Sequence, residues 1–152
     1  MRSELRVVII ATYLLLSGFS GGCARSIDES LVTAANAGDS EQIRTLLQRG
    51  ANPNALALDG WTALTVAASE GHLQAVQMLL RSGAKIDAPE GGGNTPLFWA
   101  AFYDHCDVIQ LLLSEGADIN KKSRGGESPL HVAIRLNHNE AAELLRRAGA
   151  RE

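Results

Sequence analysis

The chain has little of several features that mark common functional classes. Its 14 Lys and Arg residues are outnumbered by 17 Asp and Glu, and no basic stripe is present, which argues against a nucleic-acid partner. The net charge of −3 is dispersed and is typical of solubility rather than of an acidic interaction tail. The N-terminal apolar run, residues 7–16, has ten residues, half of the about 20 that a transmembrane helix needs. Aromatic residues make up only 5% of the chain, and there are two cysteines.

A 33-residue period organises most of the sequence. It is carried by several series of residues, among them Gly60, Gly93 and Gly126; Leu64, Leu97 and Leu130; and Gly50, Gly83, Gly116 and Gly149. A fixed period of this size indicates a repeat architecture. Each unit cannot bury its apolar face alone, so neighbouring units stack around one continuous core.

The motifs inside this period resemble those of the ankyrin repeat family. Residues 95–97 read Thr-Pro-Leu and are followed by Ala100-Ala101, by residues 111–113 (Leu-Leu-Leu) and by residues 116–120 (Gly-Ala-Asp-Ile-Asn). Residues 128–133 read Ser-Pro-Leu-His-Val-Ala and differ from the family's T-P-L-H-x-A signature only by Ser for Thr. The resemblance implies an all-α solenoid of about four helix-turn-helix units with short finger loops. Stacked helix pairs that meet through Ala and Leu would explain why aromatics are scarce.

The resemblance places the ankyrin repeat domain at residues 29–152, with units of about 29–57, 58–90, 91–123 and 124–152. The predicted helix pairs are 29–37 and 40–49, 62–70 and 73–82, 95–103 and 107–115, and 128–136 and 139–148. Inner helices should be capped by Thr62, Thr95 and Ser128. The turn within each unit falls on Gly38, Gly71, Asp104 and Asn137, residue types suited to positive φ. The first unit lacks the Thr-Pro-Leu motif and the last has Arg146 where the third has Leu113, which is typical of capping units.

Residues 1–22 have the layout of a secretory signal peptide, with basic Arg2 and Arg6, an apolar run and a small polar end. The end, Ser-Gly-Gly-Cys at residues 20–23, resembles a bacterial lipobox, in which the Cys23 thiol takes a diacylglycerol and becomes the mature N-terminus. Residues 23–28 would then form a lipidated N-terminus and linker, anchored in a lipid bilayer by its acyl chains. Ser20 departs from the usual Leu, so a soluble periplasmic or secreted protein is the alternative. Ala24 rather than Asp favours an outer-membrane or periplasm-facing lipoprotein.

Catalytic and metal-binding patterns are weak. His72, His105 and His138 recur at the period, but stacked units stand roughly 10 Å apart, too far for one ion with bonds near 2 Å. The resemblance implies instead that each bonds local backbone at a helix start, and we expect no metal and no cofactor. The glycines at 91–93 lack the strand, lysine and spacing of a phosphate loop and are expected to form a flexible finger. Cys106 aligns with Leu73 and is expected to be a small buried or half-buried hydrophobe.

The resemblance implies that a partner protein is gripped by finger tips and inner helices, which face a concave groove. The matching positions are Leu58, Asp59, Trp61, Ser69, Glu70, Asn94, Phe102, Tyr103, Arg124, Glu127, Arg135 and Leu136. Binding hot spots are enriched in Trp and Tyr, so we expect Trp61, Phe102 and Tyr103 to form an exposed aromatic patch. The alternative is that Trp61 or Phe102 folds over the neighbouring unit. Trp99 aligns with core positions and is expected to be buried packing.

These patterns together predict a non-enzymatic, monomeric, exported and lipid-anchored protein–protein interaction module. The alternative is an accessory, protective or immunity-type protein for a periplasmic enzyme or toxin. An enzyme is disfavoured, because no pair of titratable groups has a catalytic arrangement in a recognisable pocket.

The N-terminal pattern generates a direct prediction. Cys23→Ser removes the thiol that would take the acyl chains, so this variant should move from the membrane fraction to the soluble fraction. Mass spectrometry of the exported wild-type protein should find an acylated Cys23 at its N-terminus. An unmodified Cys23 on the exported chain would contradict the prediction.

Overall fold

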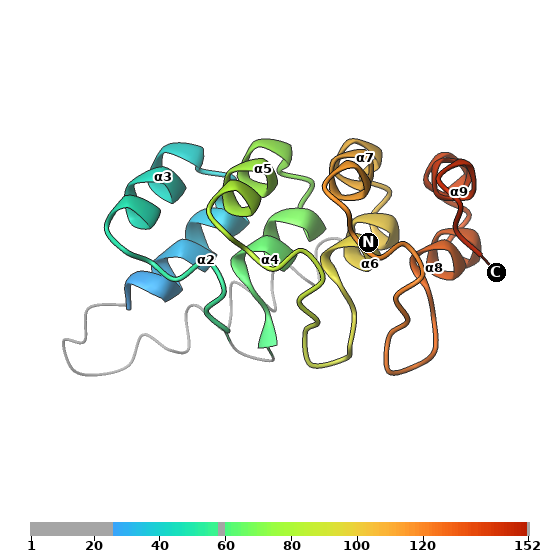
Figure 1. Ribbon diagram of the computed structural model, residues 1–152, viewed down its shortest axis with the longest axis horizontal. Helices are drawn as coiled ribbons and strands as arrows, with labels where there is room; N and C mark the ends of the chain where they lie inside the picture. The colour runs from blue at the N-terminus through green and yellow to red at the C-terminus, as the bar shows by residue number, and fades with distance from the viewer. Residues whose placement is uncertain (1–25, 58–59, 152) are drawn as a thin grey trace, which may run out of the picture.

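The structure, a computed structural model, describes residues 26–57 and 60–151, and within them it consists of two layers of α-helices (Figure 1). The inner layer holds α2 (Ile27–Ala37), α4 (Ala63–Ser69), α6 (Pro96–Phe102) and α8 (Pro129–Arg135). The outer layer holds α3 (Ser40–Gln48), α5 (Leu73–Arg81), α7 (Cys106–Ser114) and α9 (Asn139–Arg147). Each helix packs against its partner in the pair and against the equivalent helices of the adjacent units. This confirms the all-α repeat solenoid, and the predicted signal peptide and Cys23 lie outside the described residues.

The inner helices begin where the cap residues predict. The hydroxyl of Thr62 accepts from the N–H of Thr65 at 3.2 Å, and Thr95 and Ser128 make the same bond one and two units later. A side-chain acceptor at this position satisfies one of the free N–H groups of the first turn. Helix α2 begins at Ile27, two residues earlier than predicted, because Ser26 Oγ accepts from the N–H of Glu29 at 3.1 Å.

The turn within each unit has the predicted left-handed backbone. Its φ is 68° at Gly38 and 75° at Gly71, and it stays at 62° and 61° where Asp104 and Asn137 stand instead. Asp and Asn tolerate this region better than other side chains. The chain therefore reverses in the same way in all four units despite the change of residue.

The three histidines that start the outer helices bond across units rather than locally, so the expectation of a local backbone partner was wrong. His72 Nε2 donates to the carbonyl of Asn36 at 3.1 Å, and His105 Nε2 donates to that of Ser69 at 3.0 Å. Each carbonyl belongs to the end of the preceding inner helix, which leaves its last carbonyls without helical partners. The imidazoles satisfy these groups and tie adjacent units together.

The turn glycines provide the space for these imidazoles. A Cβ on Gly38 would lie 2.8 Å from Nδ1 of His72, and one on Gly71 would lie 2.6 Å from Nδ1 of His105, both closer than real Cβ contacts. The third unit has Asp104 at this position. There His138 bonds through Nδ1 instead, to the carbonyl of Ala101 at 3.2 Å, one position earlier than in the other two pairs. The Cβ of Asp104 accounts physically for this shift.

A second link between units runs along the loops after the outer helices. In three units a side-chain oxygen at the same position accepts a backbone N–H of the next unit. The pairs are Asn54 Oδ1 with Lys85 N at 2.7 Å, Asp87 Oδ1 with Asp118 N at 3.1 Å, and Asn120 Oδ1 with Arg151 N at 2.9 Å. Together with the histidine bonds, they hold every adjacent pair of units at two separate points or more.

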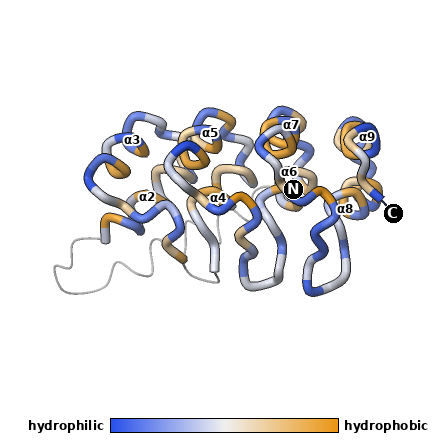
Figure 2. The backbone as a smooth tube through the Cα atoms, viewed as in Figure 1, coloured by the Kyte–Doolittle hydropathy of each residue, from blue (hydrophilic) through white to orange (hydrophobic). Residues whose placement is uncertain are grey.

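The core between the layers is made of alanines and branched aliphatics. Paired alanines on the inner helices, such as Ala67-Ala68 and Ala100-Ala101, are completely buried. Leucines such as Leu79 and Leu112 fill the space toward the outer helices and are also completely buried. Figure 2 shows the apolar residues concentrated on the helices. Among the described helices, none is both long enough and apolar enough to span a bilayer.

The core packing predicts a large effect of Leu112→Ala on stability. Leu112 is completely buried in α7, so its truncation should lower the free energy of unfolding by about 2–5 kcal/mol. The matched control is Gln110→Ala on the same helix, which is exposed and should change it by less than about 0.5 kcal/mol. Denaturant melts of both variants measure the difference, and equal destabilisation would mean that the stacking register is wrong.

Candidate partner-binding surface

Three finger loops project from the inner layer, and they share one turn geometry (Figure 1). We call residues 55–61 the second finger, 88–94 the third finger and 121–127 the fourth finger; residues 58–59 lie outside the described residues. In each finger two N–H···O bonds close the loop. In the second finger they run from Ala57 N to Trp61 O and from Gly60 N to Ala57 O. The equivalent bonds of the third finger are Glu90 N to Asn94 O and Gly93 N to Glu90 O, and those of the fourth are Ser123 N to Glu127 O and Gly126 N to Ser123 O. All six are 2.7 to 3.2 Å long.

The third finger is organised by a buried glutamate. Glu90 is 9% exposed, and its carboxylate accepts from the N–H of Gly92 at 2.7 Å, from the N–H of Asn94 at 3.0 Å and from the side-chain amide of Asn94. Such bonds to an ionised acceptor are strong. The glycine run therefore forms a hydrogen-bonded turn in the structure, and the Asn94 side chain is already engaged inside its own finger.

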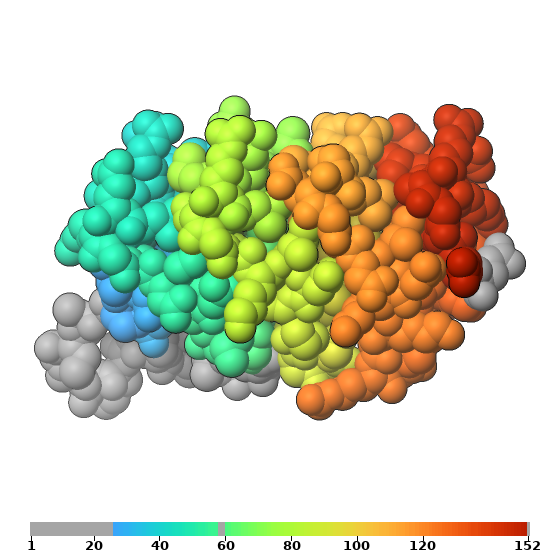
Figure 3. Space-filling model, viewed as in Figure 1, coloured from blue at the N-terminus to red at the C-terminus, as the bar shows by residue number. Residues whose placement is uncertain are grey.

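The fourth finger is joined to the third. The N–H of Arg124 donates to the carbonyl of Gly92 at 2.9 Å, so the two fingers lie side by side, as Figure 3 also shows along the lower edge of the molecule. A Cβ on Gly93 would lie 2.8 Å from the Arg124 nitrogen. Glycine is thus required at this position both for its φ of 80° and for the close approach of the next finger.

The aromatic residues gather into one cluster, which we define as Trp61, Phe98, Trp99, Phe102 and Tyr103. Trp99, 8% exposed, is its centre. Its ring centroid lies 5.0 Å from that of Trp61 in the preceding unit and 6.1 Å from that of Tyr103, which stacks on it at 18°. Ring pairs at these separations are stabilising beyond their buried area.

This packing corrects the expected exposed aromatic patch. Trp61, Phe102 and Tyr103 do belong to one cluster, but all three are half-buried and pack against the core. Trp61 lies over the neighbouring unit, as the alternative interpretation had it. Truncating these rings should therefore lower stability as well as any affinity they confer, because packed ring contacts are lost.

The remaining predicted site residues are either exposed or have side chains that are buried or already bonded. Ser69 is wrong as a contact residue: it is 7% exposed, and its hydroxyl donates to the carbonyl of Val66 at 2.9 Å. Glu127 and Arg135 form a two-bond ion pair at 2.8 and 3.2 Å. Glu70 and Arg124 are exposed, and Leu136 is half-buried against the core. Leu58 and Asp59 lie outside the described residues.

Comparisons with known protein families agree with this geometry. A model of three ankyrin repeats matches residues 31–123, and a model of many ankyrin repeats matches residues 103–146. The protein belongs to the ankyrin repeat family. No curated protein matched the chain. Ankyrin repeats are protein–protein interaction modules and typically not enzymes, which makes binding of another protein the function class of this chain.

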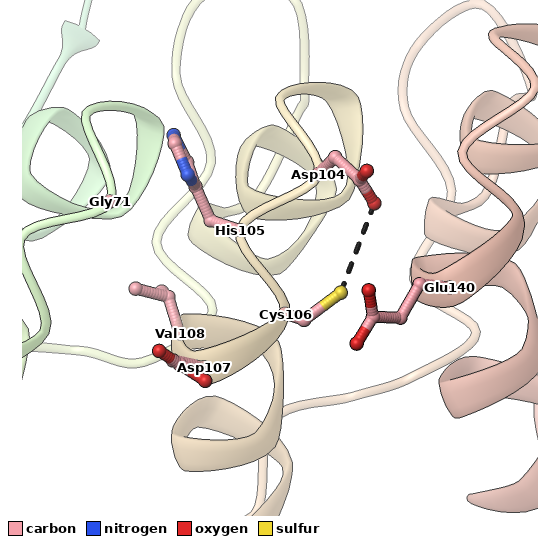
Figure 4. A pocket seen from close by; sticks show the side chains of 7 residues that line it. All are labelled: Gly71, Asp104, His105, Cys106, Asp107, Val108 and Glu140. Carbon is pink, nitrogen blue, oxygen red and sulfur yellow. Dashed lines mark hydrogen bonds between the residues drawn. The ribbon is translucent and has the colours of Figure 1, made fainter.

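One cavity of this ankyrin domain lies at the starts of the outer helices α7 and α9, and it has a volume of about 260 Å³ (Figure 4). Cys106 points into it, toward the carboxylates of Asp104 and Glu140, and its Sγ donates to Asp104 Oδ1 at 3.8 Å. Burial first, and then these negative charges, raise the pKa of the Cys106 thiol to about 11. A thiol that remains protonated is a poor nucleophile and metal ligand.

The part of the chain that the structure describes contains no group of three His, Cys, Asp or Glu side chains placed to hold a metal ion. Each periodic histidine instead faces a backbone carbonyl. Cys106 is half-buried, as its alignment with Leu73 predicted.

Sequence reasoning missed several residues of this surface. Glu90 stands where the other fingers have Ala57 and Ser123, so the repeat pattern gave no reason to single it out. Lys121 and Lys122 were not predicted as contact residues, because the contact positions that the family resemblance implies for the fourth unit begin at Arg124. Both lysines are exposed in the fourth finger.

The environment of Cys106 predicts slow alkylation. In the Cys23→Ser chain Cys106 is the only cysteine, and at pH 8 a pKa of about 11 leaves roughly 100-fold less thiolate than the ordinary 9.0. Higher thiolate reactivity offsets part of this, so iodoacetamide should react about tenfold more slowly with the folded than with the unfolded chain. The rate should keep rising above pH 9 and level off near 11.

The variant that tests the cause is Asp104→Asn, because Asn tolerates the positive φ at this position. It should speed alkylation, whereas Glu115→Gln at the far end of the same helix should not. Equal rates in the folded and unfolded chains would contradict the assignment.

Proposed function

We propose that this ankyrin repeat protein is exported, anchored to a membrane through acylated Cys23, and binds another protein without catalysing a reaction. The signal-peptide layout of residues 1–22 and the lipobox-like residues 20–23 support export and anchoring. The binding surface is the side of the molecule formed by the inner helices and the fingers, which we call the finger face. Ala24, rather than Asp, after the cysteine supports an outer-membrane or periplasm-facing location.

The observation that carries the proposal is the aromatic cluster bridging the second and third units. Trp61 and Tyr103 are each half-buried, and the ring of each packs on Trp99. Rings already held by packing lose little conformational entropy when a partner covers the part that remains accessible. Tyr and Trp are also the residue types most enriched in binding hot spots.

The finger face also has charged groups suited to the rim of an interface. The Glu127–Arg135 ion pair and the exposed Arg124 lie on the fourth unit, and Glu70 lies at the end of α4. An apolar centre with a polar rim is the usual anatomy of protein interfaces. Among the described residues, no comparable set of aromatic rings lies on the outer helices.

The linker would keep this surface close to the bilayer. Helix α2 begins at Ile27, four residues after Cys23. A fully extended stretch of four residues spans at most about 14 Å. An acylated chain would therefore present its first repeat directly at the membrane surface, which fits a partner that is itself in or near the membrane.

The proposal is tested by finding the partner and mapping its contacts. Cross-linking in intact cells followed by mass spectrometry identifies the partner, and calorimetry then measures its affinity for variants. Tyr103→Ala should weaken binding by at least about 2 kcal/mol, roughly 30-fold in Kd. Gln110→Ala, on an outer helix, is the matched control and should leave affinity unchanged.

The free energy of unfolding of each variant is measured by a denaturant melt at the temperature of the calorimetry, since Tyr103 also packs on Trp99. Affinities are compared only between variants that are folded to the same extent as the wild-type protein. An affinity loss confined to outer-helix variants would place the partner on the opposite side of the solenoid and contradict the proposal.

A further inference from the structure

We infer that the partner segment is an acidic peptide with a neighbouring apolar residue, and that the fourth finger recognises its carboxylates. The inference rests on the proposed function, because it names the chemistry of the partner that the finger face binds. It concerns three cations that the motif comparison did not single out together: Lys121, Lys122 and Arg124.

The fourth finger concentrates positive charge in an acidic chain. It has three exposed cations, Lys121, Lys122 and Arg124, while the whole chain has a net charge of −3. Its one carboxylate, Glu127, is held by Arg135 through two bonds. Asp118, the nearest acid before the finger, accepts from the N–H of Asn120 at 3.0 Å. Within the described residues no ion pair neutralises the three cations.

The other two fingers have a different character. The third finger contains one charged residue, Glu90, and that carboxylate is buried and bonded inside the loop. The second finger displays Leu56, which is 69% exposed and is the most exposed large hydrophobic residue of the described chain. Figure 2 shows the strongly hydrophilic colour on the fourth finger and not on the second. The one charged residue of the second finger, Asp59, lies outside the described residues. The row of fingers thus changes from the exposed Leu56 at one end to three cations at the other.

The cationic end is also held in place. Arg124 N–H donates to Gly92 O at 2.9 Å, and Ser123 Oγ accepts from the N–H of Glu127 at 3.2 Å. The finger backbone is therefore bonded to its neighbour and within itself. Charges on an ordered loop attract a charged ligand without the cost of ordering the backbone, although the long side chains still lose rotamer freedom.

The spacing of the fingers limits the peptide. Inner helices pack at roughly 8–10 Å, so the second and fourth fingers lie roughly 16–20 Å apart. An extended chain rises about 3.3 Å per residue, so five or six residues would separate the apolar side chain from the carboxylates. A helical segment would need about eleven to thirteen residues for the same distance.

A peptide fits these observations better than a polyanion or a bilayer does. Nucleic acids and anionic lipids attract proteins through broad positive surfaces, whereas here the net charge is −3 and the cations occupy one finger. An acidic segment with an apolar residue uses both ends of the row.

The test is a selection of random 15-residue peptides displayed on phage against the full exported chain, made soluble by Cys23→Ser. Enriched peptides should combine at least two Asp or Glu residues with a large apolar residue. Their Kd should rise at least tenfold in the variant K121E/K122E/R124E and should also rise with salt concentration. The matched control, R49E/R81E/K85E, makes the same change of net charge at exposed cations outside the fingers and should leave Kd unchanged.

Every other outcome overturns the inference. The fourth finger has no role if the enriched peptides lack an acidic excess or if their Kd is insensitive to K121E/K122E/R124E. If Tyr103→Ala still weakens the binding of such peptides, the proposed function stands. Equal weakening by both triple variants indicates unspecific attraction. If no peptide is enriched but vesicles containing phosphatidylglycerol bind through the same three cations, the fourth finger recognises a membrane. Peptides that bind only the outer helices would overturn both proposals.

Discussion

The close approach of adjacent inner helices is the constraint on which the rest of this structure depends. Helices can pack this tightly only where their contact positions are small, and Ala34-Ala35, Ala67-Ala68 and Ala100-Ala101 are completely buried there. The same approach brings His72 and His105 over the turn glycine of the preceding unit and within reach of a carbonyl there. The fingers inherit this spacing, since each one leads directly into an inner helix. A larger side chain at these alanines would separate the units, the histidine bonds and the fingers together.

Much of the fold could be predicted from local chemistry. Thr62, Thr95 and Ser128 cap inner helices and so indicate where these helices begin. The positive-φ turn can be located even where Asp104 and Asn137 replace glycine. These features involve residues within a few positions of one another. The repeat period then extends each local inference to the other units, which is why the helix bounds were obtained within two residues.

The candidate site was predicted less well because it depends on contacts between units. The repeat pattern places Ser69 at the end of an inner helix, but only the next unit determines that it is covered. Trp61 and Tyr103 were expected to be exposed, yet a single ring, Trp99, gives both a surface to pack on. Glu90 has no counterpart in the other fingers, so its bonds to Gly92 and Asn94 could not be inferred from the period. Individual departures from the repeat therefore shaped this surface more than the repeat itself did.

The difference between successive fingers gives the solenoid a direction. A chain of identical units would look the same to a ligand after a shift of one unit, and a partner could slide along it or bind in several registers. Here the second finger displays Leu56, the third is closed on its own buried carboxylate, and the fourth is cationic. A ligand shifted by one unit meets a chemically different neighbour at every step. The repeat thus sets an even spacing along the solenoid, and the three dissimilar fingers allow a ligand to bind in only one register.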